Sequence, residues 1–161
     1  PWTEAQVAAR RDHTVSDLCD EWERLGPLID ERIRAEPFLG TRLTADLVTH
    51  LHDVLTAWGR RGNRDSDAVR LGLERYGPFF CDRAAEAGLP VVEIRAGSQA
   101  WRSDAAPPEA VLTGSAFELL RAFSGRRSAA QLQAMDWQGA SASYLAVVTP
   151  YGLPADDVVE P

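Results

Sequence analysis

The apolar residues in the first part of the chain recur with the period of a helix. Between Thr14 and Ala35 they are spaced three and four positions apart, which places them on one face of an amphipathic helix. These residues are Val15, Leu18, Trp22, Leu25, Ile29 and Ile33. Thr14 to Asp17 has the pattern of an N-terminal cap with an acidic first turn. We therefore predict a helix over 14–35, with a bend at Gly26-Pro27.

Three further segments of the first half have helical character. Trp2–Arg11 is a short Ala-rich lead, and a helix is predicted from Leu43 to Trp58 with Gly59 as its C-terminal cap. A third helix begins at the cap Asp65-Ser66-Asp67 and ends near Ala87, with an interruption at Gly77-Pro78.

The pattern changes after Pro90. Residues 91–96, 99–102 and 110–113 read as three strands, with Gly97-Ser98 as the first turn, and we predict a three-stranded antiparallel meander. A helix over 116–124 and a short one capped by Ser128 follow, and the Gly- and Pro-rich tail is predicted to be irregular. Helices, strands and helices in separate blocks favour the α+β class. We expect two domains, residues 1–60 and 61–161, because 60–64 is a polar stretch.

Composition narrows the function. The 161 residues have a net charge of −7, and this acidic balance disfavours a nucleic-acid partner, which needs a basic face. No run approaches ~18 apolar residues, so no membrane partner is expected. No secretory signal is visible either, and a cytoplasmic location follows as the default. Cys19 and Cys81 stand in apolar helical patterns, so we expect two buried free thiols.

One cluster of side chains has the spacing of a metal site. On a helix over 43–58, Leu43, Leu47, Leu51, Val54 and Trp58 form an apolar stripe, and Asp46, His50 and Asp53 lie along its border. Asp46 and His50 are one turn apart, as two metal ligands on a helix are.

The same spacing has a plainer interpretation, which is a surface pair of an acid and a histidine. Asp53 can serve as a ligand or can orient His50 through its other ring nitrogen. The remaining histidines do not complete the site, because His52 points to the opposite face and His13 is expected in a solvated loop.

Other catalytic patterns are missing from the sequence. It contains no GxSxG, GxGxxG or GxxxxGK[ST] motif, so a triad hydrolase, a dinucleotide site and a P-loop have no support. Gly125-Arg126-Arg127 is a modest signal, since a loop guanidinium can clamp a carboxylate with two hydrogen bonds. A solvated arginine at a helix end is the alternative there.

Two motifs resemble a known family. The stretch from Thr44 to Gly59 is similar to the signature helix of the actinobacterial mycothiol-dependent maleylpyruvate isomerase family, within the DinB-like group of thiol-dependent metalloenzymes. The stretch from Phe117 to Ser128 resembles the second hallmark of that family, a helix that ends in Gly-Arg. The likeness covers essentially the whole chain.

The resemblance implies a fold and a site. It implies a DinB-like four-helix bundle that holds a divalent metal, zinc above all, followed by an α/β domain similar to a sterol carrier. Asp46 and His50 match two metal ligands of the family, although its best-known members have Glu where this chain has Asp46. Arg126 matches the Gly-Arg arginine at the domain interface, which implies a catalytic and cofactor-binding role toward the substrate or thiol.

The chain resembles the family only from the third helix of the bundle onward, and a third ligand is not in it. We expect an N-terminal bundle half outside this chain, or a partner subunit that supplies it. Without it, the apolar stripes of helices 14–35 and 43–58 would be exposed.

Three functions are carried forward. The first is an isomerase or S-transferase that uses a divalent metal and mycothiol, or a similar thiol, on a small electrophilic substrate. The second is a non-catalytic binding or regulatory module of the same fold. The third is a small-ligand carrier built on the C-terminal domain.

Overall fold

The structure is a computed structural model that describes residues 2–161. It divides into two compact units, one up to Gly40 and one from Thr41 to the end. The boundary expected near residue 60 therefore lies inside the second unit. The division falls within helix α3 (Pro37–Ala57), because the side chains that α3 buries, all after Thr41, belong to the core of the second unit.

The first unit is helical and has no core of its own. It comprises α1 (Trp2–Ala9), α2 (Val15–Ala35) and the first turn of α3. Thr14 caps α2 with a capping box in which the Asp17 backbone N–H donates to the Thr14 hydroxyl and Asp17 accepts from the Thr14 backbone, as the sequence predicts. The helix continues through Pro27. None of residues 2–40 is buried.

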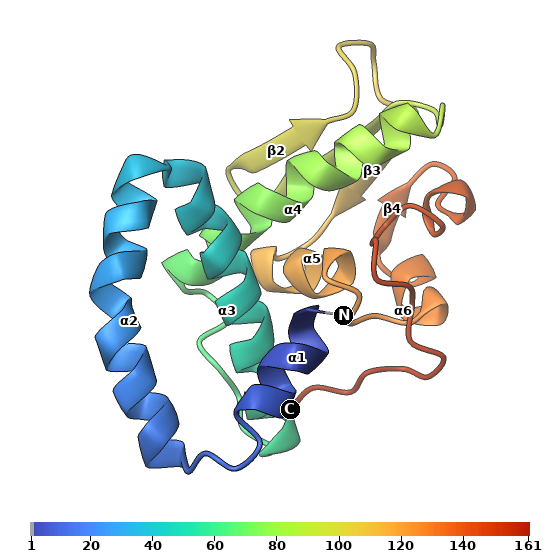
Figure 1. Ribbon diagram of the computed structural model, residues 1–161. Coiled ribbons are helices and arrows are strands. Elements are labelled where there is room, and N and C mark those ends of the chain that lie inside the picture. Colours follow the sequence, from blue (N-terminus) through green and yellow to red (C-terminus); the bar gives the residue numbers. More distant parts are fainter. Residues whose placement is uncertain (1) are drawn as a thin grey trace. The chain divides into compact units, whose positions relative to one another are not determined.

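The second unit joins helices to a small sheet (Figure 1), which confirms the α+β class. Its helices after α3 are α4 (Asp67–Glu86), α5 (Ala116–Phe123), α6 (Ala129–Gln133) and a 3-10 turn over Ala142–Tyr144. Its strands are β1 (Val92–Ala96), β2 (Gln99–Arg102), β3 (Ala110–Thr113) and β4 (Asp136–Gln138). The predicted residues Ser66 and Ser128 are the N-caps of α4 and α6. Gly59, which follows α3, has a φ of +63°, as expected for a glycine that ends a helix.

The sheet corrects the predicted three-stranded antiparallel meander. It has four strands in the order β2-β1-β3-β4, and β1 pairs with β3 in parallel, while the outer pairs are antiparallel. After the β1–β2 hairpin, the loop at 103–109 returns the chain to the free edge of β1, so β3 runs in the direction of β1. The predicted arrangement would have placed β3 beside β2.

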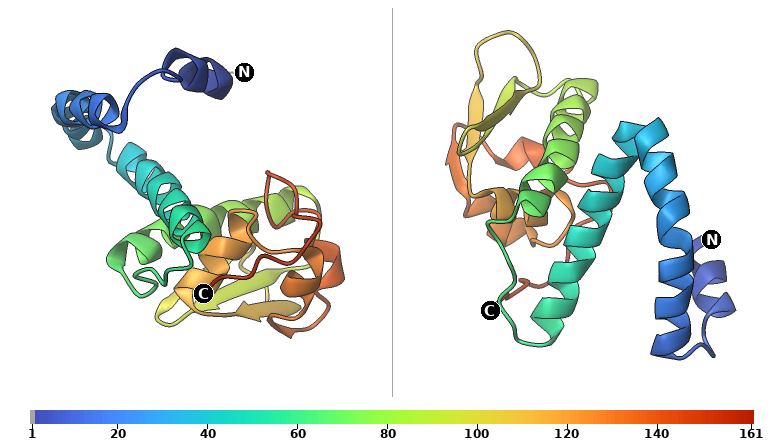
Figure 2. Two further views of the ribbon diagram at one scale, coloured as in Figure 1. Left: turned by 90° about the horizontal axis from the view of Figure 1, so that it is seen from below. Right: turned by 90° about the vertical axis from the view of Figure 1, so that its left-hand side faces the viewer.

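The core of the second unit lies between the sheet and two helices. In both views of Figure 2, α4 and α5 lie on the same side of the sheet. Phe80 of α4 stacks on Phe123 of α5 at 4.9 Å between ring centroids. Gly72 lets α3 approach closely, because a Cβ there would lie 3.0 Å from atoms of Val48 and Leu120.

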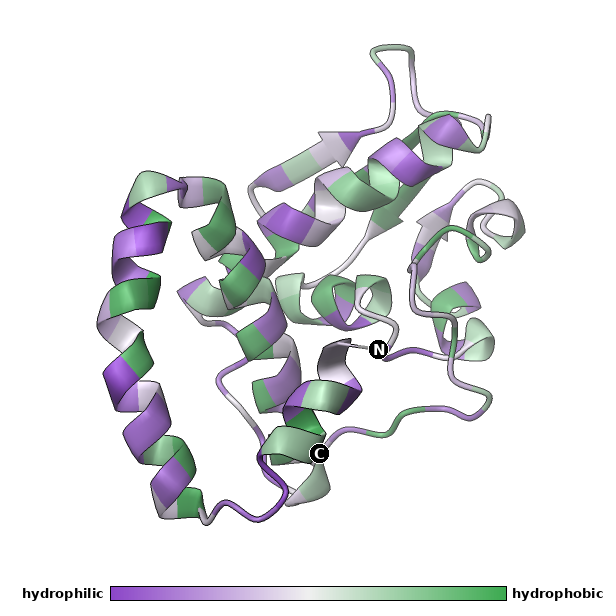
Figure 3. Cartoon of the chain, in the orientation of Figure 1, coloured by the Kyte–Doolittle hydropathy of each residue, from purple (hydrophilic) through white to green (hydrophobic). Residues whose placement is uncertain are grey.

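Helix α3 leaves several of its large apolar side chains exposed. Ala45, Val48, Thr49 and His52 are buried, whereas Leu47, Leu51, Val54 and Trp58 are 46–69% exposed. On α2, Val15, Trp22 and Leu28 are more than 60% exposed. Figure 3 shows green, hydrophobic segments that alternate with purple ones along both helices. The exposed apolar stripes that the resemblance implied are thus confirmed for residues 2–161.

Two further features complete the fold. The thiols differ from the expectation of two buried cysteines, since Cys81 is buried but Cys19 is exposed. Cys19 lies on α2, in the first unit, where none of the described residues is buried. Within residues 2–161, no helix is both long and apolar enough to cross a membrane.

Candidate functional site

The predicted ligand pair lies on the exposed side of α3. Oδ1 of Asp46 is 3.7 Å from Nε2 of His50, and the two side chains are 71% and 61% exposed. Helical spacing alone brings them together, because residues four apart lie one above the other. Both border the exposed stripe that contains Leu47 and Leu51. The predicted pair is therefore formed and accessible.

Asp53 orients His50 from the other side of its ring. Oδ2 of Asp53 is 3.1 Å from Nδ1 of His50. An ionised carboxylate can only accept, so in the neutral imidazole Nδ1 carries the hydrogen and Nε2 keeps its lone pair toward Asp46. Of the two roles open to Asp53 from the sequence, the geometry favours the orienting one.

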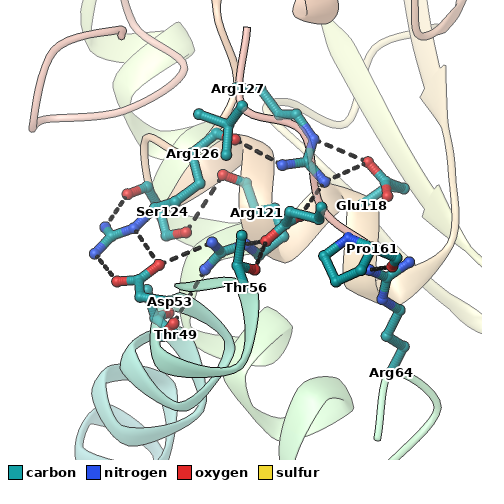
Figure 4. Close-up of polar contacts among 12 residues, drawn as sticks. Thr49, Asp53, Thr56, Arg64, Glu118, Arg121, Ser124, Arg126, Arg127 and Pro161 are labelled. Atoms are coloured by element: carbon teal, nitrogen blue, oxygen red, sulfur yellow. Dashed lines mark hydrogen bonds and ion pairs between the residues drawn. The ribbon is translucent and has the colours of Figure 1, made fainter. Parts of the chain in front are cut away.

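Two arginines fix the Asp53 carboxylate. Arg121 donates to Oδ1 at 2.8 Å, and Arg126 donates to Oδ1 at 3.2 Å and to Oδ2 at 2.7 Å (Figure 4). Partial burial acts to raise the pKa of Asp53, but the hydrogen bonds from Arg126 and Arg121 outweigh it and lower the pKa to about 2. Asp53 is consequently ionised at any physiological pH.

The residues present fit part of a divalent-metal site. Asp46 and His50 offer one oxygen and one nitrogen, which suit a divalent cation such as zinc, but a zinc site takes at least three protein ligands. Among residues 2–161, no group of three or more His, Cys, Asp or Glu is arranged to hold a metal. Asp53 does not serve as the third ligand, because its oxygens are already bonded to Arg121 and Arg126.

Arg126 lies beside this cluster, with its guanidinium already bonded. Besides Asp53, it donates through Nη1 to the carbonyl oxygen of Ser124 at 2.5 Å, and its side chain is 25% exposed. The expected contact with a substrate or thiol would therefore share the guanidinium with Asp53. Arg126 is joined to His50 through the Asp53 carboxylate.

The sequence reasoning missed the buried part of the network. Arg121 is 1% exposed and joins Asp53 to Glu160, which is 4% exposed and also contacts Arg127 at 2.6 Å. Arg121 stands in the predicted helix 116–124, four residues after Phe117, so its position on the apolar face was the available signal. Nothing in the sequence marks Glu160.

His52 is also part of the core of the second unit. It packs edge-on against Phe117 at 4.7 Å between ring centroids and is 2% exposed. Burial, followed by the positive charge of Arg121, lowers the pKa of His52, so the ring is neutral. His52 faces away from the Asp46–His50 pair, as expected, and His13 is exposed, also as expected.

Comparisons with protein-family models, with curated proteins and with solved structures find no match for this chain. The likeness to the maleylpyruvate isomerase family stays a prediction that rests on the two motifs.

Proposed function

We propose that this chain carries part of the site of a metal- and thiol-dependent enzyme, an isomerase or S-transferase of the maleylpyruvate isomerase type that acts in the cytoplasm. The observation that supports it is the pair Asp46 and His50, exposed on α3 and held in a ligand-like orientation by Asp53.

The chain's own residues divide the work. Asp46 and His50 would hold a divalent cation, zinc by preference, and Asp53 keeps the Nε2 lone pair of His50 available. The cation would lower the pKa of a small thiol such as mycothiol and so supply a nucleophile. Arg126 would bind a carboxylate of the electrophilic substrate or of the thiol, because it lies next to Asp53 and is partly exposed.

The remaining metal ligands would come from a covering element. Leu47, Leu51 and Val54 form an exposed apolar strip beside the pair. An N-terminal bundle segment or a partner subunit that covers this strip would bring its own side chains next to Asp46 and His50. This proposal explains why large apolar residues stand beside two polar metal donors.

Metal binding tests the proposal. Because the chain offers two ligands, we expect Zn²⁺ titration followed by calorimetry to show one weak site, and we expect Asp46→Ala and His50→Ala each to weaken binding at least about tenfold. His13→Ala is the matched control, since His13 is an exposed histidine outside the cluster. Zinc that stays bound at full affinity in the Asp46→Ala/His50→Ala double variant would contradict the proposal.

The second candidate is a non-catalytic binding or regulatory module of the same fold. It is favoured by the two-donor cluster and by the engagement of Arg126 with Asp53. Thiol-dependent turnover of an electrophile such as maleylpyruvate separates the two, because a module without catalysis shows none. Turnover that Arg126→Gln abolishes would support the enzyme.

A further inference from the structure

Polar contacts from Asp157, Val158 and Glu160 hold the segment 157–160 to the rest of the second unit. The Ser128 hydroxyl donates to the Asp157 carboxylate, and the backbone N–H and carbonyl of Val158 are both paired with the side-chain amide of Gln131, at 3.1 and 2.9 Å. The side-chain amide of Gln131 thus pairs with the main chain of Val158 as the backbone of a neighbouring strand would. This contact does not depend on the identity of the side chain at position 158.

The acidic side chain that follows is the best-held part of the segment. One oxygen of Glu160 forms an ion pair with Arg121, 2.8 Å from Nε, and the other accepts a hydrogen bond from Arg127 Nη2 at 2.6 Å. Thr56 of α3 also donates to it at 3.3 Å. The carboxylate is therefore bound by two arginines and a hydroxyl from three separate elements, which is the composition of a carboxylate-binding pocket.

The segment itself contributes little apolar packing. Residues 157–160 contain no helix or strand, Asp157 is exposed, and Val159 is 83% exposed. Segments with few buried apolar contacts open at low free energy. Opening would separate Glu160 from both arginines, and Arg121 would keep Asp53 and Arg127 would keep Glu118 as a carboxylate partner.

We propose that Arg121, Arg127, Ser128 and Gln131 form a binding groove for an extended acidic peptide, and that the chain's own residues 157–160 occupy it as a releasable latch. The groove recognises a carboxylate three residues after an Asp, with the main chain between them bound by Gln131. Because Arg121 also bonds Asp53, opening the latch removes one of the two carboxylate partners of an arginine that holds Asp53, the residue that orients His50. The groove does not depend on metal binding, so the peptide experiment below tests it independently of the proposed metal- and thiol-dependent function.

Competition in trans tests the groove. The probe is a fluorescein-labelled peptide with the sequence of residues 155–161, Ala-Asp-Asp-Val-Val-Glu-Pro, measured by polarisation against the full chain. The tethered latch competes at a millimolar effective concentration, so the wild-type chain should bind the peptide weakly. In the variant Asp157→Asn/Glu160→Gln, whose own latch is weakened, we expect binding at least about tenfold tighter.

Two controls identify the groove. A peptide with Gln in place of its Glu should bind this variant at least about tenfold more weakly, and adding Arg127→Gln to the variant should have the same effect. Equal binding of the peptide to wild type and variant, or no binding to either, would overturn the proposal.

Hydrogen exchange on the wild-type chain gives a second answer if the variant does not fold. Unlabelled peptide in millimolar excess should speed exchange of the chain's own backbone amides at 157–160, while the amides of α5 stay unchanged. Exchange that is insensitive to the peptide would count against the latch.

Discussion

At the scale of single residues, Asp53 is the junction between the exposed ligand pair and the buried charges. It contacts His50 on the solvent side and two arginines on the other. Arg121 is almost fully buried, so its two carboxylate partners, Asp53 and Glu160, neutralise a charge that would otherwise be costly. The contribution of Asp53 to stability should therefore be much larger than that of Asp46 on the same helix.

The first prediction compares Asp53→Asn with Asp46→Asn. We expect Asp53→Asn to lower the free energy of unfolding by about 1.5–3 kcal/mol, because hydrogen bonds to charged groups have this magnitude. Asp46→Asn should change it by no more than about 0.5 kcal/mol, because Asp46 is 71% exposed and has no arginine partner. Urea denaturation of both variants at pH 7 measures the difference, and equal losses would show that the arginine contacts contribute nothing.

Acid provides the control within the same experiment. The pKa of Asp53 is lowered in the folded state to about 2, so its stabilisation is full above the unfolded pKa near 4 and is lost as the pH falls toward 2. With a discount for its one-third exposure, this stabilisation amounts to roughly 1–2 kcal/mol. The gap between wild type and Asp53→Asn should consequently narrow from pH 5 to pH 2.5, and a constant gap would assign the effect to side-chain shape.

Which residues the sequence could identify depended on distance along the chain. Asp46, His50 and Asp53 lie within eight positions on one helix, so helical geometry alone predicted their proximity. Arg121 meets Asp53 and Glu160 only through the tertiary fold, with a separation of 68 positions between Arg121 and Asp53. No local pattern encodes such contacts.

At the scale of elements, the two Gly-Pro pairs show why a bend was predicted and continuous helices formed. Both α2 and α4 run through their proline, Pro27 and Pro78. A residue before proline is crowded in the helical conformation, and glycine, which has no Cβ, relieves that crowding. Gly77 has a second reason to be glycine, since a Cβ there would lie 2.6 Å from the ring of Trp101.

The second prediction uses Gly26→Ala as the matched control for Gly77→Ala. Both change the residue before a helical proline, but a Cβ at Gly26 has nothing within 4 Å. We expect Gly77→Ala to destabilise the chain by about 1–3 kcal/mol through overpacking against Trp101, and Gly26→Ala to stay within about 0.5 kcal/mol. Thermal unfolding followed by tryptophan fluorescence reports both, and equal effects would exclude the contact with Trp101.

The elements were predictable where a local pattern fixed them. Capping residues located the starts of α2, α4 and α6, whereas α3 begins at Pro37, six positions before the predicted Leu43. Gly97, with φ of +60°, turns the first hairpin as expected. The side of β1 on which β3 pairs is decided by packing of the connecting loop and the helices, which the alternation of a four-residue strand does not record. The same limit applies to α3, whose buried face is set by the close approach at Gly72 and not by its largest apolar residues.

At the scale of the whole molecule, burial is distributed unevenly between the two units. Every buried side chain among residues 2–161 belongs to the unit from Thr41 onward. Isolated helices are marginal in water, because most helical stability in proteins comes from packing of an apolar face. Helix α2 has such an apolar face, and Val15 and Trp22 on it are exposed. Among the described residues, α2 is stabilised by its capping box and by ion pairs and not by burial of this face.

The third prediction follows from this asymmetry. In hydrogen exchange at low micromolar concentration, we expect the amides of α2 to exchange at least about 100-fold faster than those of α4, which contacts the core along its length. Helix α5 is the internal control and should match α4, since six of its eight residues are buried. Equal protection of α2 and α4 would mean that something covers the apolar face of α2. Dilution then identifies the cover, because protection that falls with concentration requires a second copy of the chain and protection that does not change requires a contact within one chain.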